Sequence, residues 1–328
     1  MIEDETDRAL RDSLRTPALS AEALQRIRRA TEAEWRATLA QRPARRWWPA
    51  VAASAVVAVA LGAATVALAP WAQTGEPVGQ LARAETPGIE RVRDFWPDVT
   101  LLDGAQLHGG QNFAVHGASL VSLPSGGNLR IAPGSKLEVL AANTIRLAAG
   151  ELYVDIPRGA RTDGPAVITD AGVFRHIGTQ FALAVTDGQT RLRVREGRVQ
   201  WRAADGESTV SAGTEILIGR NQQVTRRDIG PSGVEWAWTE ALAPGIDIEN
   251  QPLAAFLDWV SRETGRRLVI ADEQTREQIA AIRTHGDVRG LTPMQALGAV
   301  MSSTSLHLDV TANAIRVSFA GETSPPPG

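Results

Sequence analysis

Side chains that commonly carry chemistry are sparse in this 328-residue chain. It has no cysteine, which excludes thiol nucleophiles, cysteine-based zinc sites and iron–sulfur clusters. It also lacks a Gly-x-Ser-x-Gly elbow and a phosphate-binding Gly-x-x-x-x-Gly-Lys loop. None of the histidines has the His-Glu-x-x-His spacing of a zinc-binding helix; they are His108, His116, His176, His285 and His307. We therefore expect no multiple-turnover enzyme, no metal and no cofactor.

The chain is instead organised around an uncharged, mostly apolar stretch at residues 50–69. A helix needs about 20 such residues to cross a bilayer core. Trp47, Trp48 and Trp71 flank the stretch, and tryptophan suits the two membrane interfaces. Residues 47–71 are therefore predicted to form a single transmembrane helix. A signal sequence and a buried soluble helix are the alternatives, although the long segment before the stretch argues against a signal sequence.

Positive charge is distributed unevenly around this stretch. Arginine is dense before it, at Arg26, Arg28, Arg29, Arg36, Arg42, Arg45 and Arg46, whereas Arg83 is the first arginine after it. The positive-inside rule then places residues 1–46 in the cytoplasm and the bulk of the chain in the periplasm, anchored in the inner membrane. The net charge of −3 argues against a general nucleic-acid binder.

The N-terminal segment, residues 1–46, is predicted to be a helical head. Leu24, Ile27 and Trp35 recur at helical spacing and form an amphipathic stripe. Two short helices cannot bury much surface alone, so this stripe is a candidate docking segment for a cytoplasmic protein. The alternative is a solvated tail whose arginines set topology and contact anionic lipid. The sequence favours neither.

Beyond the stretch, the pattern predicts mainly β structure. Residues 72–95 are punctuated by proline and glycine and are interpreted as a linker. Residues 96–230 contain many short runs of alternating apolar residues separated by turn residues such as Asp187-Gly188 and Asp205-Gly206. Even spacing of such runs predicts an all-β domain of short antiparallel strands.

Three motifs in this domain occur in a recognisable order. They are Gly150-Glu151-Leu152-Tyr153-Val154, Gly178-Thr179-Gln180-Phe181 and Glu196-Gly197-Arg198-Val199. The domain resembles the periplasmic domain of FecR-type transmembrane anti-sigma regulators. The family's Leu-x-Asp-Gly-Ser turn is altered, since Pro124 and Ser125 stand where Asp is usual. The resemblance implies a regulator of an extracytoplasmic-function sigma factor.

The resemblance also draws attention to the peptide bond between Gly178 and Thr179. In some FecR-type regulators such a bond breaks itself, when the threonine hydroxyl attacks the preceding carbonyl. The structural alternative is that Gly178 permits close backbone approach and Thr179 is an ordinary β-branched strand residue. Single-turnover cleavage at Gly178 and Thr179 is thus a candidate activity.

Residues 231–320 have mixed helix and strand patterns, and residues 321–328 are predicted to be disordered. The order βαββαββ is expected. Its strands are at 246–249 and 268–270, an extended segment is at 279–287, helices begin at Pro252 and Pro293, and a final hairpin is at 306–310 and 314–319. This part resembles the short module of secretins and TonB-dependent transducers. The strands at 246–249 and 314–319 are expected to be edges that pair with a partner strand. Their candidate partner-binding residues are Ile246, Ile248, Ile315 and Val317.

The resemblance implies a complete signalling route. A signal would pass from the periplasmic signalling domain of a TonB-dependent outer-membrane transporter to the C-terminal module. Envelope proteases would then release a cytoplasmic fragment with its sigma factor, bound through residues 1–46. The rival function is a membrane-anchored envelope scaffold or binding module without transcriptional output, because the head lacks the family's usual motif.

Overall fold

The computed structural model describes residues 77–93, 97–160 and 164–319. Within these ranges no helix is both long enough and apolar enough to cross a membrane. The predicted transmembrane segment, the head that carries Leu24, Ile27 and Trp35, and the predicted disordered tail lie outside the described residues.

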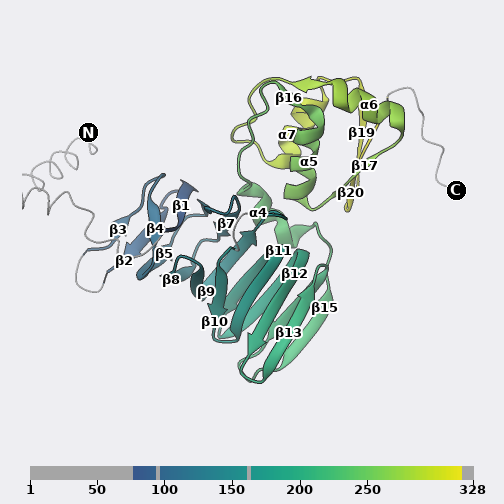
Figure 1. The fold of residues 1–328 in the computed structure, drawn as a ribbon. Helices are drawn as coiled ribbons and strands as arrows, with labels where there is room; N and C mark the ends of the chain where they lie inside the picture. Colours follow the sequence, from purple (N-terminus) through teal and green to yellow (C-terminus); the bar gives the residue numbers. More distant parts are fainter. Residues whose placement is uncertain (1–76, 94–96, 161–163, 320–328) are drawn as a thin grey trace, which may run out of the picture. The chain divides into compact units, whose positions relative to one another are not determined.

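The first part of the described chain forms one 15-stranded sheet (Figure 1). Its strands are β1 (Pro77–Ala84), β2 (Ile89–Val92), β3 (Val99–Thr100), β4 (Gln106–His108), β5 (Gln111–Val115), β6 (Ser119–Ser122), β7 (Asn128–Ile131), β8 (Lys136–Ala141), β9 (Thr144–Asp155), β10 (Ala166–Thr169), β11 (Gly172–Thr186), β12 (Gln189–Ala203), β13 (Gly206–Ser211), β14 (Thr214–Ile218) and β15 (Val224–Asp228). The predicted all-β domain is confirmed, but its strands are not all short, since β11 and β12 have 15 residues each.

Within the described sheet, only β9 and β10 run parallel, which corrects the expectation of a purely antiparallel domain. The main strand order is β15-β14-β12-β11-β10-β9-β7-β6-β1-β4. Strand β11 also pairs directly with β9 beyond the end of β10. Strands β7, β9, β11 and β12 therefore lie side by side, and their register fixes which side chains meet on each face.

The interpretation of residues 72–95 as a linker is wrong for β1 and β2. Strand β1 pairs with both β4 and β6, and β2 pairs with β3 and β5. Val78, Leu81 and Ile89 are buried in the domain core. Gly79 lies in an irregularity of β1 where an added Cβ would be 2.6 Å from the carbonyl oxygen of Ser122. Glycine here permits close packing of strands rather than a flexible connection.

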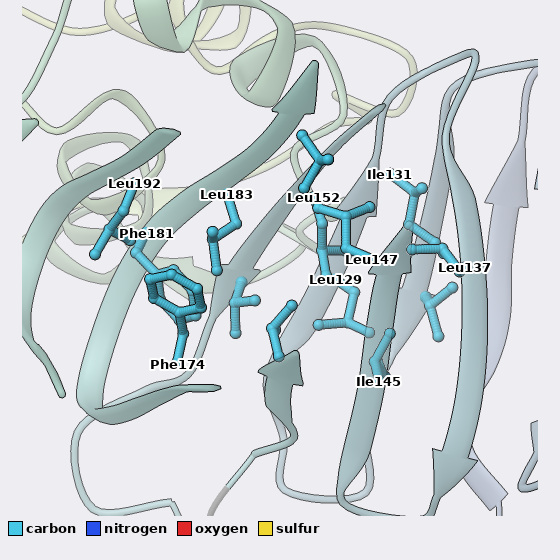
Figure 2. Packing of buried hydrophobic residues seen from close by; sticks show 14 of the residues in the cluster. Leu129, Ile131, Leu137, Ile145, Leu147, Leu152, Phe174, Phe181, Leu183 and Leu192 are labelled. Carbon is cyan, nitrogen blue, oxygen red and sulfur yellow. The ribbon is translucent and has the colours of Figure 1, made fainter. Parts of the chain in front are cut away.

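One face of the sheet forms a hydrophobic core (Figure 2). Leu129 and Ile131 of β7, Leu152 of β9, and Phe181 and Leu183 of β11 all point into it. Successive strand residues point to opposite faces, so the residues between these lie on the other side. Those intervening positions build the site described below.

The second part of the described chain, residues 231–319, is a small α+β module. Its elements are η1 (Val234–Trp236), α4 (Ala237–Ala241), β16 (Gln251–Pro252), α5 (Leu253–Thr264), β17 (Arg267–Ile270), α6 (Glu273–Ala281), β18 (Arg283–Thr284), α7 (Pro293–Met301), β19 (Leu306–Val310) and β20 (Ala314–Phe319). Helix α5 buries Leu253, Phe256, Leu257 and Val260 at helical spacing and ends at Gly265, whose φ of 65° suits glycine.

The predicted order βαββαββ is incomplete because it lacks α6. The side chain of Asp272 accepts a hydrogen bond from the backbone N–H of Thr275 at 2.7 Å and begins that helix. Residues 279–281, expected to be extended, therefore belong to α6. Residues 246–249 form no strand, and the chain first pairs at the two-residue strand β16.

The predicted C-terminal hairpin is confirmed, since β19 and β20 pair antiparallel at the expected residues. Its place in the sheet differs from expectation. The strand order is β17-β20-β19, and β17 runs parallel to β20. Strand β20 is thus central, and the edges of this sheet are β17 and β19.

Candidate functional site

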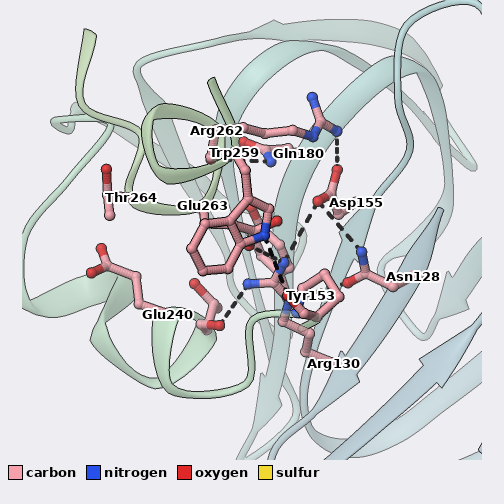
Figure 3. A network of polar contacts seen from close by, with 12 residues as sticks. Asn128, Arg130, Tyr153, Asp155, Gln180, Glu240, Trp259, Arg262, Glu263 and Thr264 are labelled. Carbon is pink, nitrogen blue, oxygen red and sulfur yellow. Dashed lines mark hydrogen bonds and ion pairs between the residues drawn. The ribbon is translucent and has the colours of Figure 1, made fainter. Parts of the chain in front are cut away.

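The outer face of β7, β9, β11 and β12 is polar and buried, unlike most surfaces of a sheet domain. We call it the docking face, and it consists of the buried Arg130, Tyr153, Asp155, Gln180 and Arg195 and the partly buried Asn128. Figure 3 labels these residues apart from Arg195. Asp155 pairs in register with both Asn128 and Gln180, while Tyr153 pairs with Arg130. These side chains alternate with core residues such as Leu129 and Val154, so the strands present two unlike faces.

Two adjacent bulges shape the docking face. On β11, Gly178 and Thr179 lie opposite the single residue Gly197 of β12. On β12, Arg195 is the extra residue between the pairs Gln180↔Glu196 and Phe181↔Val194. A bulge changes the local direction of a strand, and the extra residue here, Arg195, is buried. Arg195 contacts the C-terminal module, and we call the contact between the docking face and this module the seam.

Arg130 is the centre of this seam. Its Nη2 lies 2.5 Å from Glu263 of α5, and its Nη1 donates to the carbonyl oxygen of Thr239 at 2.6 Å (Figure 3). The Arg130 and Glu263 side chains are 0% and 3% exposed. Arg130 also lies 3.6 Å from Asp155 and over the Tyr153 ring, with 5.0 Å between Cζ and the ring centroid.

Arg262, the residue before Glu263, contacts three neighbouring strands. Its guanidinium pairs with Asp155 of β9 and lies 3.5 Å from Glu196 of β12. Its carbonyl oxygen accepts a hydrogen bond from Gln180 of β11 at 3.4 Å. The last turn of α5 is therefore held against β9, β11 and β12 at the level of the bulges.

Arg195 closes the C-terminal end of α5. Its Nη1 donates to the carbonyl oxygen of Glu263 at 3.0 Å, and its Nε donates to that of Pro231 at 2.6 Å. A cation at a helix C-terminus satisfies carbonyls that lack intrahelical partners and complements the helix dipole. Arg195 also pairs with Glu240 at 3.3 Å and lies over the Trp236 ring.

Burial shifts the pKa values of several side chains in this seam. It raises the pKa of Glu263, although the neighbouring Arg130 guanidinium opposes this. It also raises the pKa of Glu240, with Arg195 opposing. Burial raises the pKa of Tyr153 to about 12, so its hydroxyl stays protonated at physiological pH. These groups serve as hydrogen-bonding and ion-pairing partners in the seam.

Two open hollows lie in this region, one at the seam and one at the first bulge. One, of about 370 Å³, lies along the end of α5 and includes Arg195, Arg262 and Arg266 in its lining. The other, of about 620 Å³, includes Arg158, Gly178 and Gly197. Among residues 77–93, 97–160 and 164–319, no group of three potential His, Asp or Glu ligands could hold a metal ion.

The peptide bond between Gly178 and Thr179 lies in the first bulge, and Gly178 has a φ of 55°. A Cβ added at Gly197 would lie 2.5 Å from the carbonyl oxygen of Gly178, so the two glycines pack closely. Thr179 is 1% exposed, and its Oγ1 has no hydrogen-bond partner within the part of the chain that the structure describes. Glycine adopts this φ readily, so the geometry supplies proximity and no evident backbone strain.

The predicted partner-binding residues of the module are mostly unsuitable for direct contact. Ile315 and Val317 are fully buried in the central strand β20, and Ile248 is also buried in the module core. Ile246 is half-buried and packs against the same core. The pattern at 314–319 was correctly recognised as a strand, but it marks the inward face of a central strand and not an edge, whereas residues 246–249 form no strand.

The seam residues themselves were missed by the sequence analysis. Arg130 and Asp155 each occupy a strand position next to a core residue, where a polar residue ordinarily faces solvent. The one available signal was the break in alternation around Arg195, which indicates a bulge. Their partners on α5 are more than 60 positions away along the chain, beyond the reach of any local pattern.

Comparison with known proteins identifies the domain that carries the docking face. The family model described as FecR protein matches residues 113–200, a stretch that includes every docking-face residue. None of the curated proteins matches the chain.

Two crystal structures of a candidate anti-sigma factor from Parabacteroides distasonis, at 2.50 and 1.65 Å resolution, are similar to this chain. Their identities are 15% and 14%, and their TM-scores are 0.32 and 0.34. The matches cover 62% and 63% of this chain and 94% and 97% of those chains. Structural similarity at this level supports no statement about the function of this chain. The family match lies within the sheet domain, at residues 113–200, and we call this domain the FecR domain.

Proposed function

We propose that the chain is a single-pass inner-membrane regulator of an extracytoplasmic-function sigma factor. The observation that carries this proposal is the match of residues 113–200 to the FecR family model. The sequence adds the apolar stretch at 50–69 and the arginine-rich segment before it. In this proposal, residues 1–46 bind the sigma factor in the cytoplasm, and the FecR domain and C-terminal module receive a signal in the periplasm.

The signal would come from the periplasmic signalling domain of a TonB-dependent outer-membrane transporter. The module offers two edge strands, β17 and β19, each paired with β20 on one side within the described residues. An edge strand presents unpaired backbone groups to which a partner strand can add. In this proposal β17 and β19 are the candidate partner-binding edges, in place of the segments at 246–249 and 314–319.

Sigma-factor binding is tested by affinity purification of the full chain and mass spectrometry of what it retains. Leu24→Asp together with Trp35→Asp should abolish retention, because both remove apolar surface from the predicted stripe. Leu102→Asp is the matched control, since Leu102 is 79% exposed in the FecR domain. Absence of any sigma factor from the wild-type eluate would instead favour the rival function, an envelope scaffold without transcriptional output.

Topology is tested separately with a β-lactamase fused after residue 328, which leaves the described domains intact. The fusion should protect cells from ampicillin, because β-lactamase acts only after export. A matching fusion of green fluorescent protein should be dark in the periplasm. Fluorescence without ampicillin resistance would contradict the proposed orientation.

A second candidate function is self-cleavage between Gly178 and Thr179. The buried Thr179 Oγ1, which lacks a hydrogen-bond partner among the described residues, favours it. In this reaction Oγ1 attacks the Gly178 carbonyl carbon, the C–N bond breaks, and the threonine nitrogen takes up the hydroxyl proton. Water then hydrolyses the resulting ester, leaving a Gly178 carboxylate and a Thr179 amine.

Self-cleavage is tested by the intact mass of the purified chain after prolonged incubation without protease. Wild type and Thr179→Ser should yield fragments 1–178 and 179–328, whereas Thr179→Ala should stay whole. Full-length wild type as the single species would dismiss the activity. Gly178 would then serve only the bulge, and any signalling cut would belong to envelope proteases.

A further inference from the structure

The FecR domain and the C-terminal module have separate hydrophobic cores. The first core comprises residues between 78 and 218, and the second comprises residues between 248 and 317, with no member in common. A small third cluster of Tyr153, Ala182 and Trp236 lies between them. Apart from this cluster and the stacking of Arg195 on the Trp236 ring, the contacts described across the seam are ion pairs and hydrogen bonds.

Buried ion pairs impose geometry more than they add stability. Removing two charges from water costs several kcal/mol per ion, and their attraction in the protein offsets much of this cost. Arg130, Asp155 and Glu263 are at most 3% exposed, so they bear this cost in full. The ion pairs of the seam thus add little net stability to the docked arrangement.

The charges on the docking face retain partners when the module is absent. Arg130 lies 3.6 Å from Asp155, and its Nε donates a hydrogen bond to Asn128 Oδ1 at 3.1 Å. On the module side, Arg262 and Glu263 would be exposed to water at the end of α5. Separation therefore exchanges buried pairs for one surface pair and solvated ions. It opens neither of the two large hydrophobic cores and exposes only the small cluster of Tyr153, Ala182 and Trp236.

We propose that the seam is a releasable latch, with Glu263 at its centre, and that the C-terminal module undocks from the FecR domain as a folded body. Release frees the docking face, including Arg130, Tyr153 and Arg195. It also withdraws Arg262 from β9, β11 and β12, and so removes the support of the bulges. The use of this release to relay a signal rests on the proposed function, whereas the release itself does not.

The absence of native cysteine allows a direct measurement of docking in the full chain. Lys136→Cys on the FecR domain and Glu277→Cys on α6 change two exposed residues, each of which can carry a spin label. Double electron–electron resonance should give one dominant distance in the wild-type background. Glu263→Gln should add a longer distance and raise the ratio of undocked to docked molecules at least about tenfold, because it leaves Arg130 without its closest carboxylate.

Two further variants separate the latch from general destabilisation. Glu273→Gln removes an exposed carboxylate that pairs with Arg276 on the same helix and should leave the distance unchanged. Arg130→Met combined with Glu263→Leu replaces both charges by apolar groups and should keep the module docked. An undocked population in this double variant as large as in Glu263→Gln would overturn the latch.

Circular dichroism on the same samples shows whether both domains stay folded. Arg262→Gln is the milder companion variant, because Arg262 is 29% exposed and its loss leaves the Arg130–Glu263 pair in place. It should also produce the longer distance. A single unchanged distance in both Glu263→Gln and Arg262→Gln, or loss of secondary structure in both, would overturn the proposal.

Sigma-factor retention by the same Glu263→Gln chain distinguishes the latch from the proposed function. A longer distance with altered retention supports both. A longer distance with unchanged retention supports the latch and contradicts its role as a relay. An unchanged distance with normal sigma-factor retention contradicts the latch and leaves the regulator intact.

Discussion

The two faces of β7, β9 and β11 show how one set of strands serves two purposes. The inner face carries Leu129, Leu152 and Phe181, which pack into the FecR-domain core. The outer face carries Arg130, Asp155 and Gln180, which are equally buried but contact the C-terminal module by polar groups. Burial alone therefore does not indicate what a residue contributes. Apolar burial stabilises the domain, whereas paired charges select one docked arrangement.

Phe181→Ala gives the largest expected effect, because Phe181 is fully buried in the core. Deletion of such a ring costs about 3–5 kcal/mol through lost burial and the remaining cavity. Denaturant unfolding followed by circular dichroism measures this loss. If the inner face alone stabilises the domain, the module should remain docked at low denaturant. If Phe181→Ala undocks the module without lowering the stability of the domain, the inner face contributes to docking and the assigned roles of the two faces are wrong.

Gly265→Ala tests the outer face by steric means. An added Cβ would lie 2.1 Å from the carbonyl oxygen of Pro231 and 2.5 Å from Arg195 Nε. The left-handed conformation adds about 1–2 kcal/mol for a residue with a Cβ. We expect the end of α5 to move away from Arg195, with a longer spin-label distance. Gly290→Ala is the control, since it also has a positive φ but no atom within 4 Å of the added Cβ.

Thr292→Ala tests whether the module is stabilised separately. Thr292 forms a capping box with Gln295 at the start of α7, and loss of such a cap costs about 1 kcal/mol. The loss should lower the melting temperature of the module and leave that of the FecR domain unchanged in calorimetry. An equal shift of a single transition would show that the two cores unfold together and that the seam is part of one cooperative unit.

Local patterns in the sequence predicted much of the architecture. The hairpin of β19 and β20, helix α5 and the β texture of the FecR domain depend on periodicity and turn residues within a few positions. The strand β1 was missed because Pro77 and Gly79 resemble linker punctuation, although they pack in a strand. Helix α6 was missed because its apolar pattern is weak and its cap, Asp272, was overlooked.

The candidate site could not be predicted in the same way. Its contacts join positions far apart in sequence, such as Arg130 and Glu263, which are 133 residues apart. Strand order also determines whether the predicted partner residues are exposed. Ile315 and Val317 have the right pattern for a strand, but only the order β17-β20-β19 shows that this strand is central and buried.

The sequence separation of the seam has a consequence for the order of folding. Each core forms from its own continuous segment, while the contacts of Arg130 and Arg195 with α5 must close loops of more than 60 residues. Contacts of such long range are expected to form after the rate-limiting step, once both domains exist. Replacing Arg130 should therefore accelerate unfolding and hardly slow refolding in a stopped-flow denaturant series. Amide hydrogens at the end of α5 should accordingly exchange through openings that leave β9 and β11 protected.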